Sequence, residues 1–205
     1  MNTEALYLAG FAFPVENLGP GRRVAMWVEG CSLDCPGCMS PEIFRQRHPV
    51  PVQEATRQIL RLLTEADGLT ISGGEPFQQA STLAEVIRRL RVVRPVEVLV
   101  YTGYELEEIL AGPPAGRELL RLVDVLIDGR FELSTANTKQ WRGSDNQRVH
   151  LLTERSRRYA GEAERLFPTP RVLHLQPLDS FRVRIIGIPE RGRRIRPMLQ
   201  VRKVR

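Results

Sequence analysis

The feature that most constrains this chain is a short loop that contains all of its cysteines. Cys31, Cys35 and Cys38 are the only cysteines in 205 residues, and their spacing is C-x3-C-x2-C. Thiolates are soft ligands that suit zinc, copper(I) or iron–sulfur clusters. A disulfide framework uses an even number of cysteines in a secreted protein, and three core cysteines would not need to be neighbours. The loop therefore predicts a metal centre.

Two kinds of metal centre fit three clustered thiolates. On a [4Fe-4S] cluster, three protein ligands leave one iron open, much as a catalytic zinc keeps one position for chemistry. The alternative is a closed Cys3His zinc site with His48 as the fourth ligand. That spacing is permitted, although structural zinc sites usually have two ligand pairs with short internal gaps. The pattern favours the open cluster and leaves zinc as the alternative.

The rest of the chain is typical of one globular domain. Its length, with 42% hydrophobic residues, allows a sizeable core. Glu4 stands where a signal peptide would carry Lys or Arg, and residues 5–13 are too short and too closely flanked by Gly and Pro to span a bilayer. We expect a cytoplasmic protein without a membrane segment, in reducing conditions that suit thiolate ligands.

Apolar runs alternate with amphipathic segments over the first two thirds of the sequence. Strands are predicted at 6–13, 24–28, 69–72, 96–101 and 123–127, and helices at 54–67, 80–93, 104–110 and 117–122. Such alternation predicts an α/β fold in which a parallel sheet carries its helices on the outside. Residues 41–52, which contain three prolines, are expected to be irregular.

Chemically useful residues follow several of these strands directly. Cys31, the segment Gly73-Gly74-Glu75, Thr102 and Asp128 each come just past a predicted strand end. Ligands of parallel sheets bind at the carboxyl ends of the strands. These residues are therefore expected to line one rim.

The pattern is weaker after residue 130. A further strand is expected at 149–152 and a charged helix at 154–167. Phe181, Val183 and Ile185 alternate with arginines, which is the period of a half-buried strand, and residues 195–204 are expected to pair back with it as a hairpin. We divide the chain into a core of residues 1–152 and a basic extension of residues 153–205 that packs on the core.

The net charge of +6 is concentrated near the end of the chain. Residues 181–205 contain eight Arg and one Lys against a single acid, Glu190. A basic edge could meet nucleic acid or an acidic protein. A solvated hairpin with arginines on its outer face fits the same residues at least as well. Nucleic acid is therefore a possible partner that the sequence does not favour.

The cysteine loop, followed by Gly73-Gly74-Glu75-Pro76 at the end of the next strand, resembles the radical S-adenosylmethionine (SAM) superfamily. The resemblance implies that Cys31, Cys35 and Cys38 hold the cluster, that SAM chelates the open iron, and that the glycine-rich turn recognises its amino group. The residue types agree, since glycines permit close backbone approach and an acid suits an ammonium. The alternative is an ordinary strand-to-helix turn with Glu75 as an early-helix acid.

Further motifs narrow the resemblance to activases of glycyl radical enzymes, and in particular to the activating proteins of anaerobic (class III) ribonucleotide reductases. These motifs are Leu18-Gly19-Pro20-Gly21-Arg22-Arg23, Cys35-Pro36-Gly37-Cys38, Tyr101-Thr102-Gly103-Tyr104, and the segments 124–129 and 142–148. The resemblance covers residues 6–152. Met39 and Ser40 depart from it, because the family usually has an aromatic residue and Asn there.

The resemblance implies a set of site residues. The expected cofactor contacts are Gly37, Gly73, Gly74, Glu75, Thr102 and Asp128, and the expected lid or partner contacts are Arg142, Gly143, Ser144, Asn146, Gln147 and Arg148. For this last group a solvent loop is the alternative, because Gly, Ser, Asp and Asn favour turns. With four confident βα-type strands, the expected fold is a partial, open radical SAM (β/α) barrel with room for a protein substrate.

The implied activity is reductive cleavage of SAM, which gives a 5′-deoxyadenosyl radical that takes a hydrogen atom from a glycine of a partner enzyme. The partner would resemble anaerobic ribonucleotide reductase, and a flavodoxin or ferredoxin would supply the electron. Two rivals stay open at this point. One is a radical SAM enzyme that acts on a nucleotide-derived or RNA substrate, and the other is a non-catalytic zinc or iron–sulfur interaction module.

Overall fold

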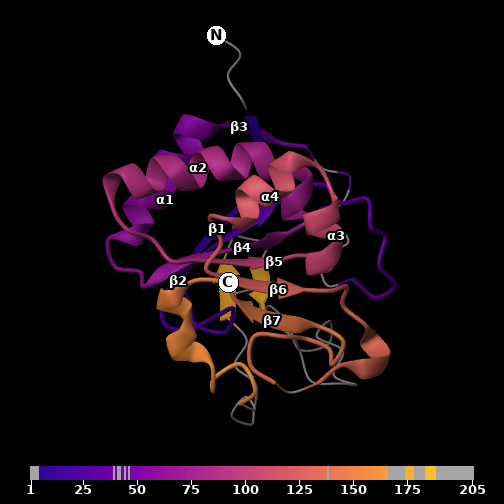
Figure 1. Ribbon diagram of the computed structural model, residues 1–205. Helices are drawn as coiled ribbons and strands as arrows, with labels where there is room; N and C mark the ends of the chain where they lie inside the picture. The colour runs from indigo at the N-terminus through magenta and orange to yellow at the C-terminus, as the bar shows by residue number, and fades with distance from the viewer. Residues whose placement is uncertain are drawn as a thin grey trace, which may run out of the picture.

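The computed structural model describes residues 5–38, 40, 43, 45, 47–137, 139–165, 174–177 and 183–187. Its centre is a seven-stranded sheet in the order β3-β1-β2-β4-β5-β6-β7 (Figure 1). The strands are β1 (Ala5–Val15), β2 (Arg23–Val28), β3 (Pro49–Pro51), β4 (Gly68–Gly73), β5 (Val98–Tyr101), β6 (Val125–Asp128) and β7 (Arg148–Leu151). The α-helices are α1 (Val52–Leu63), α2 (Ala80–Val93), α3 (Leu106–Ala111) and α4 (Pro114–Leu120). Short 3-10 helices occur at η2 (Pro76–Gln79), η3 (Leu133–Thr135) and η4 (Glu154–Tyr159).

The middle of the sheet is parallel and its borders are antiparallel. Strands β2, β4, β5 and β6 pair in parallel, as the alternation of strands and helices predicted. Strand β1 runs antiparallel to both β2 and β3, and β7 runs antiparallel to β6. The edge strand β3 lies in the segment expected to be irregular. Its prolines fit an edge position, because an edge strand does not need every backbone donor.

Helices cover one face of this sheet and form the larger core. Side chains from alternate strand positions, including Val24, Met26, Ile71 and Val100, pack there against the buried stripes of α1 and α2. Helix α2 has the predicted bounds. Helix α1 begins at Val52 and ends at Leu63, earlier than the predicted 54–67. The shift is small and leaves the predicted apolar face, with Ile59 fully buried, turned to the sheet.

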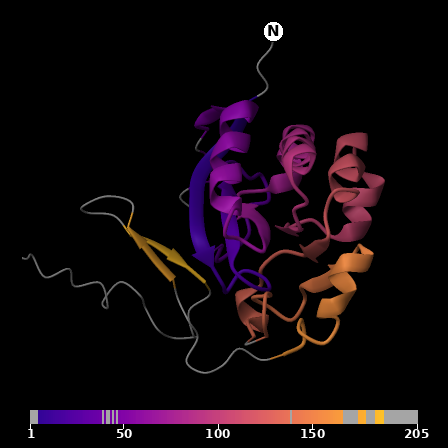
Figure 2. The ribbon, with the colours of Figure 1, turned by 90° about the vertical axis from the view of Figure 1, so that its left-hand side faces the viewer.

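The opposite face of the sheet is covered by the C-terminal part of the chain. Leu99, Val125 and Ile127 pack there against Trp141 and Tyr159. A second antiparallel pair, β8 (His174–Pro177) and β9 (Val183–Ile186), contributes Ile186 to a small cluster with residues of β1 and β2. Figure 2 places this pair on the far side of β1 from α2 and α4. The two faces of the sheet are therefore buried by different parts of the chain.

The C-terminal predictions are confirmed in part. The strand expected at 149–152 exists as β7, and the strand expected around Val183 exists as β9. The described partner of β9 is β8, which precedes it, whereas residues 195–204 lie outside the described residues. The helix predicted at 154–167 is wrong: the chain forms the 3-10 helix η4 and then turns. Polar caps at Thr153 and Ser156 fix this short element.

The amino-terminal end of β2 carries a buried ion pair. The Arg23 side chain is fully buried, its Nη1 lies 3.1 Å from Glu97 Oε1, and its Nε donates to Thr70 Oγ1 at 2.6 Å. Its remaining donors reach backbone carbonyls, for example Leu69 O at 2.9 Å. Gly19 has φ +131°, and a Cβ there would lie 2.7 Å from Arg23 Cδ. The motif at 18–23 thus lies at the amino-terminal end of β2, whereas the cysteines follow its carboxyl-terminal end.

Within the described residues, no helix is both long and apolar enough to cross a membrane.

Candidate functional site

The three cysteines line one cavity at the carboxyl ends of the parallel strands. This cavity of about 150 Å³ is also lined by the Gly73-Gly74-Glu75 turn after β4, by Tyr101, Thr102 and Gly103 at the end of β5, and by Gly129, Arg130 and Phe131 after β6. The structure thus brings together most of the residues that the sequence predicted for one rim. Asp128 and Gly37 are not among the residues that line it.

Backbone donors within the loop point at two of the three sulfur atoms. The N–H groups of Leu33 and Ser40 donate to Cys31 Sγ and Cys38 Sγ, each at 3.4 Å. Gly37 has φ +75° in the turn that lets Cys38 N donate to Cys35 O at 3.2 Å. Such N–H···S contacts favour a thiolate and are among the features that tune iron–sulfur clusters. The loop therefore suits soft metal chemistry.

The thiols are poor ligands until a metal displaces their protons. All three cysteines are free and half-buried. Burial raises the pKa of Cys31 and Cys35, and each neighbouring thiolate raises it further, whereas the Arg130 guanidinium lowers it for Cys35. A bound iron would reverse this balance, because a coordinated thiol gives up its proton. The donor set and the shared cavity fit a cluster with three protein ligands.

The alternative of a closed zinc site finds no support in the geometry. The His48 ring lies with Nδ1 2.7 Å from Glu29 Oε1 and is not among the cavity-lining residues. Among the described residues, no three His, Cys, Asp or Glu side chains approach closely enough to hold a single metal ion. Ligands of a cubane cluster stand on different iron atoms and need not converge on one point. The arrangement of the cysteines therefore favours a cluster over a lone ion.

The two glycines of the turn are needed first for packing against the start of the cysteine loop. A Cβ on Gly73, which has φ +108°, would lie 2.4 Å from Val28 O, and one on Gly74 would lie 2.2 Å from Gly30 O. Gly74 N donates to Val28 O at 2.8 Å, and Glu75 N donates to Gly30 O at 2.9 Å. These bonds join the turn to the residues just before Cys31.

Glu75 caps a short helix and also lines the cysteine cavity. It caps η2 by accepting from Phe77 N at 2.8 Å, as an early-helix acid would. The same carboxylate accepts from Thr102 Oγ1 at 2.8 Å and Gly103 N at 2.9 Å, which ties β4 to β5. Burial raises the pKa of Glu75 to about 7, although these three bonds oppose the shift. A cation in the cavity would stabilise the ionised form.

The Asp128 carboxylate is hydrogen-bonded to neighbouring elements. Its carboxylate accepts from Leu106 N at 2.8 Å, at the start of α3, and from Arg148 Nη2 at 2.6 Å. Burial alone would raise the pKa of Asp128, but the bonds from Arg148, Leu106 and His150 hold it below its ordinary value. This carboxylate ties the end of β6 to α3 and β7, and its role as a cofactor contact stays a prediction.

The segment 142–148 is a folded turn whose side chains support the rim. Arg142, Gly143, Ser144 and Gln147 are buried, whereas Asn146 at the tip is exposed. Gln147 Nε2 donates to Gly129 O at 3.0 Å, Asn146 Nδ2 donates to Arg130 O at 2.7 Å, and Ser144 Oγ accepts from Glu132 N at 3.1 Å. The residues predicted as a lid or partner contact thus brace the loop after β6, and the exposed tip is the part that can meet a partner.

Eight cavity residues were not predicted as part of the site: Leu33, Ser40, Ser72, Tyr101, Gly103, Gly129, Arg130 and Phe131. Each lies within three residues of a predicted residue in the sequence, and Tyr101 lies in a motif that the sequence singled out. For Ser72 and Tyr101, the missing signal was the direction of each side chain at its strand end. That direction follows from the register, which the sequence does not state.

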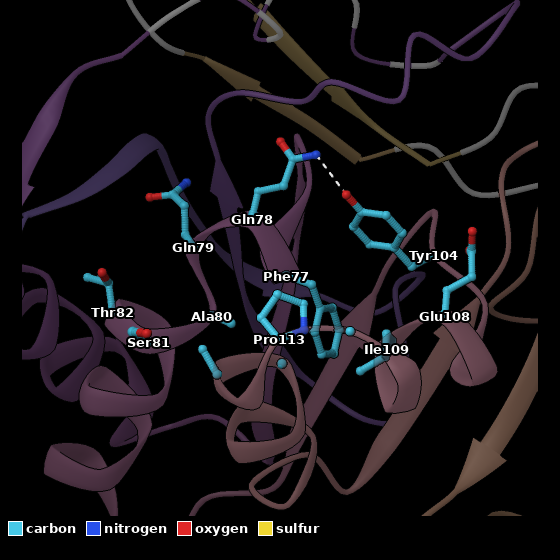
Figure 3. A pocket seen from close by; sticks show the side chains of 13 residues that line it. Phe77, Gln78, Gln79, Ala80, Ser81, Thr82, Tyr104, Glu108, Ile109 and Pro113 are labelled. Carbon is cyan, nitrogen blue, oxygen red and sulfur yellow. Dashed lines mark hydrogen bonds between the residues drawn. The ribbon is translucent and has the colours of Figure 1, made fainter.

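A larger groove opens beside the cysteine cavity. About 670 Å³ in volume, it lies between the start of α2 and the α3–α4 pair and is lined by Phe77, Ile109 and Pro113 among others (Figure 3). Gln78 Nε2 donates to Tyr104 Oη at 3.1 Å and to Ser32 Oγ at 2.6 Å. Through Gln78 the groove is connected to the cysteine loop.

Comparison with known proteins agrees with this site. Residues 17–150 match a family model described as a 4Fe-4S single cluster domain. The chain is 34% identical over 150 residues to the anaerobic ribonucleoside-triphosphate reductase-activating protein of Escherichia coli K12, which covers 68% of this chain and 96% of that protein. Proteins of the same name from bacteriophage T4 and Haemophilus influenzae are 31% and 33% identical, over 75% and 70% of this chain and 96% of each relative.

Proposed function

This chain belongs to the family of anaerobic ribonucleoside-triphosphate reductase-activating proteins, and we propose that it uses a [4Fe-4S] cluster and SAM to place a glycyl radical on such a reductase. The observation that carries the proposal is the single cavity shared by the three cysteines and the Gly73-Gly74-Glu75 turn. The activity of the protein is that of a radical SAM oxidoreductase. When bound, the cluster supplies the electron that cleaves SAM reductively.

Cys31, Cys35 and Cys38 are the proposed ligands. Support comes from their common cavity and from the N–H groups that face Cys31 Sγ and Cys38 Sγ. The loop is anchored at both the strand and the turn, since Glu75 N and Gly30 O are joined at 2.9 Å. This bond holds the start of the loop, next to Cys31, before any metal binds, which reduces the cost of ordering it.

Glu75 and the backbone of the turn are the proposed contacts for the SAM amino group, with Thr102 and Gly37 as further candidates. Glu75 accepts three hydrogen bonds from the chain, and a carboxylate offers about four acceptor positions. One position is thus left for an ammonium. Burial of the pair in the cavity strengthens the attraction relative to water.

Partner recognition is the least specified part of the proposal. A protein substrate needs an open rim, and the sheet stays open between its edge strands β3 and β7. We therefore propose a partial, open radical SAM (β/α) barrel whose exposed Asn146 tip meets the reductase. An electron donor such as flavodoxin or ferredoxin and a cytoplasmic location, where thiols stay reduced, complete the proposal. The basic residues at 188–205, the remaining candidate for nucleic acid binding, lie outside the described residues.

We also propose residues 1–152 as the catalytic core and 153–205 as an extension packed on it. Support for the packing comes from Tyr159 and Ala163, which are buried with Leu99 and Val125 of the sheet.

One experiment tests the function directly. The anaerobically reconstituted protein is mixed with SAM, a reductant and the anaerobic reductase from the same organism, and electron paramagnetic resonance is recorded. A glycyl radical signal that requires both SAM and this protein is expected. Cleavage of SAM without any radical on the reductase would contradict the proposed partner. Absence of SAM cleavage by cluster-loaded protein would contradict the proposed activity.

A further inference from the structure

The groove between the start of α2 and the α3–α4 pair is a cavity that the proposed chemistry leaves unused. Its volume is about 670 Å³, against about 150 Å³ for the cysteine cavity. Clefts of several hundred Å³, with apolar walls and a few placed polar groups, are the usual form of a binding site. The groove therefore has room for side chains of a binding partner.

The floor of the groove is apolar and preformed. Phe77, Ile109 and Pro113 line it (Figure 3). Ile109 is buried in the main core, and Phe77 packs against the same core. A Cβ on Gly116 would lie 3.6 Å from Ile109 Cγ2 and 3.8 Å from Phe77 Cδ1, so α4 lies against both side chains. A floor that is already packed lowers the cost of binding, because little has to be ordered.

The charge at the groove is opposite in sign to that of the chain as a whole. The chain has a net charge of +6, yet Glu108 is the one charged side chain among the described residues that line the groove. Glu105 and Glu107, at the start of α3, are exposed beside it. The base that approaches both of them, Arg148, is also bound by the buried Asp128. The α3 side of the groove therefore attracts a cation.

The Glu108 carboxylate has one oxygen left for such a cation. Its Oε2 accepts from Glu105 N at 2.7 Å in a capping box, and its Oε1 has no partner within the described residues. The aromatic rings of Phe77 and Tyr104 line the same groove. Aromatic rings beside a carboxylate suit a Lys or Arg side chain, whose long apolar stem packs on the rings while its charged end reaches the carboxylate.

The groove lies next to the site proposed for the radical chemistry. Gln78 Nε2 donates to Ser32 Oγ in the cysteine loop at 2.6 Å and to Tyr104 Oη at 3.1 Å, so Gln78 borders both the groove and the loop. The charge of Glu108 is also near enough to Glu75 to raise the pKa of that carboxyl. A protein segment held in the groove would therefore lie beside the cysteine cavity.

We propose that this groove binds a segment of the substrate reductase in which a Lys or Arg stands beside apolar residues. The cationic group pairs with Glu108, and the apolar side chains pack on Phe77 and Ile109. The inference rests on the proposed function, because it takes the reductase as the partner. Binding in the groove holds the reductase chain beside the cavity that its glycine has to reach.

The test uses two groove variants, each with a matched control on the same helix. Glu108→Gln removes the charge and keeps an acceptor for Glu105 N; its control is Glu107→Gln, an exposed acid that does not line the groove. Ser81→Trp fills the groove from its exposed edge; its control is Val92→Trp, at an exposed position of α2 outside the groove. All four proteins are reconstituted with the cluster and matched for iron content. Their affinity for the fluorescently labelled anaerobic reductase of the same organism is measured at low and at high salt.

The two groove variants should bind the reductase more weakly than their controls. Glu108→Gln should lose roughly 5- to 20-fold in affinity at low salt, as for the loss of one hydrogen bond to a charged group, and less at high salt. Ser81→Trp should lose roughly 10-fold or more at either salt concentration, because the indole occupies the space of the bound side chains. Both controls should stay within about 2-fold of the wild type, as expected for surface positions outside the interface. All four melting temperatures should match that of the wild type.

Two results would overturn the inference. One is wild-type affinity of Glu108→Gln for the reductase, even if Ser81→Trp binds weakly, because the groove would then hold an uncharged segment. The other is unchanged reductase affinity in both groove variants with slower reduction of the cluster by flavodoxin, which would assign the groove to the electron donor. A wild-type protein that cleaves SAM but leaves no radical on the reductase would instead refute the proposed function, so the two failures are distinguishable.

Discussion

The two ends of strand β2 carry the two most informative motifs of the sequence, and they are built in opposite ways. At the first end, the Arg23 side chain is fully buried and its nitrogen atoms donate to Thr70, to Glu97 and to a backbone carbonyl. At the other end, the cysteine loop is half-buried, and the N–H groups of Leu33 and Ser40 donate to Cys31 Sγ and Cys38 Sγ. Arg23 has its partners within the chain without any ligand, whereas the cysteine loop offers sulfur atoms that a metal could still bind.

This difference separates structural motifs from functional ones within one family signature. In parallel α/β folds, the carboxyl ends of the strands carry the chemistry and the amino ends carry stability. Arg23 and its glycines, which resembled an activase element, serve stability, whereas Cys31 and the Gly73-Gly74-Glu75 turn build the site. The sequence predicted the ligand role of the cysteines, whereas the resemblance that identified the motif at 18–23 gave it no role.

The largest effect is expected from substitutions in the cysteine loop, at the carboxyl end of β2. Replacing Cys31, Cys35 or Cys38 with Ala should reduce reductive SAM cleavage by at least roughly 100-fold, which exceeds the effect expected for an outer-shell partner of a metal. The protein should still fold, because the loop adds little to the buried core. Product formation, iron and sulfide content and circular dichroism check this. A variant that keeps full cluster content would contradict the ligand assignment.

The next largest effect is expected at the amino-terminal end of β2, where loss of the buried ion pair should lower stability. Glu97→Gln should lower the free energy of unfolding by about 3 to 5 kcal/mol, because it leaves the buried Arg23 charge uncompensated. Arg158→Ala removes an exposed partner of the same carboxylate and should cost at most about 1 kcal/mol. Urea unfolding measures both values. Equal costs for the two variants would show that the buried pair is not the main anchor.

A smaller effect concerns pH at the site itself. Because burial raises the pKa of Glu75 to about 7 from its ordinary value of 4.5, the carboxyl is protonated below pH 7 and cannot attract an ammonium. SAM affinity should therefore fall as the pH is lowered from about 8 to about 6, and Glu75→Gln should be weak and much less pH-dependent. Equilibrium dialysis measures this.

The same shift has a consequence for stability without SAM. The folded protein holds the Glu75 proton more tightly than the unfolded chain, so this group contributes stability below about pH 4.5 that is lost as the pH rises through about 7. Urea unfolding of wild-type protein and Glu75→Gln across this range checks the sign. An unchanged difference between them would place the Glu75 pKa near its ordinary value.

The smallest effect is expected from the basic end of the chain. Removing residues 188–205, which contain six Arg and one Lys, should leave SAM cleavage and melting temperature nearly unchanged. Any loss should appear as weaker binding to an acidic partner that diminishes with salt. If the truncated protein folds but no longer cleaves SAM, the segment contributes to the cavity.

Much of the fold was predictable because it rests on periodicity. The bounds of α2, the parallel order of β2, β4, β5 and β6, and the shared rim of Cys31 and Glu75 all follow from patterns that span a few residues. The antiparallel edges were harder, since β3 is three residues long and bounded by prolines. Its pairing depends on contacts with β1 that are distant in sequence.

The metal ligands of the site could be predicted from the sequence, but the residues that hold the surrounding loops in place could not. Cysteine spacing and glycine-rich turns are local signals, whereas the burial of Arg142 and Gln147 depends on how the chain returns past β6. Turn-forming residues at 142–148 predicted an exposed loop or lid because their composition resembles that of surface turns. Tyr101 was missed for the same reason, since its orientation is set by pairing with β6.

The central claim is that the cysteine end of β2 holds a [4Fe-4S] cluster with one iron open to SAM. The most direct test is the electron paramagnetic resonance spectrum of the anaerobically reconstituted and reduced protein, recorded with and without SAM. We expect about four irons and four sulfides per chain and a spectrum that changes when SAM is added. A protein with one zinc and no sulfide, or a cluster spectrum that is insensitive to saturating SAM, would contradict the account.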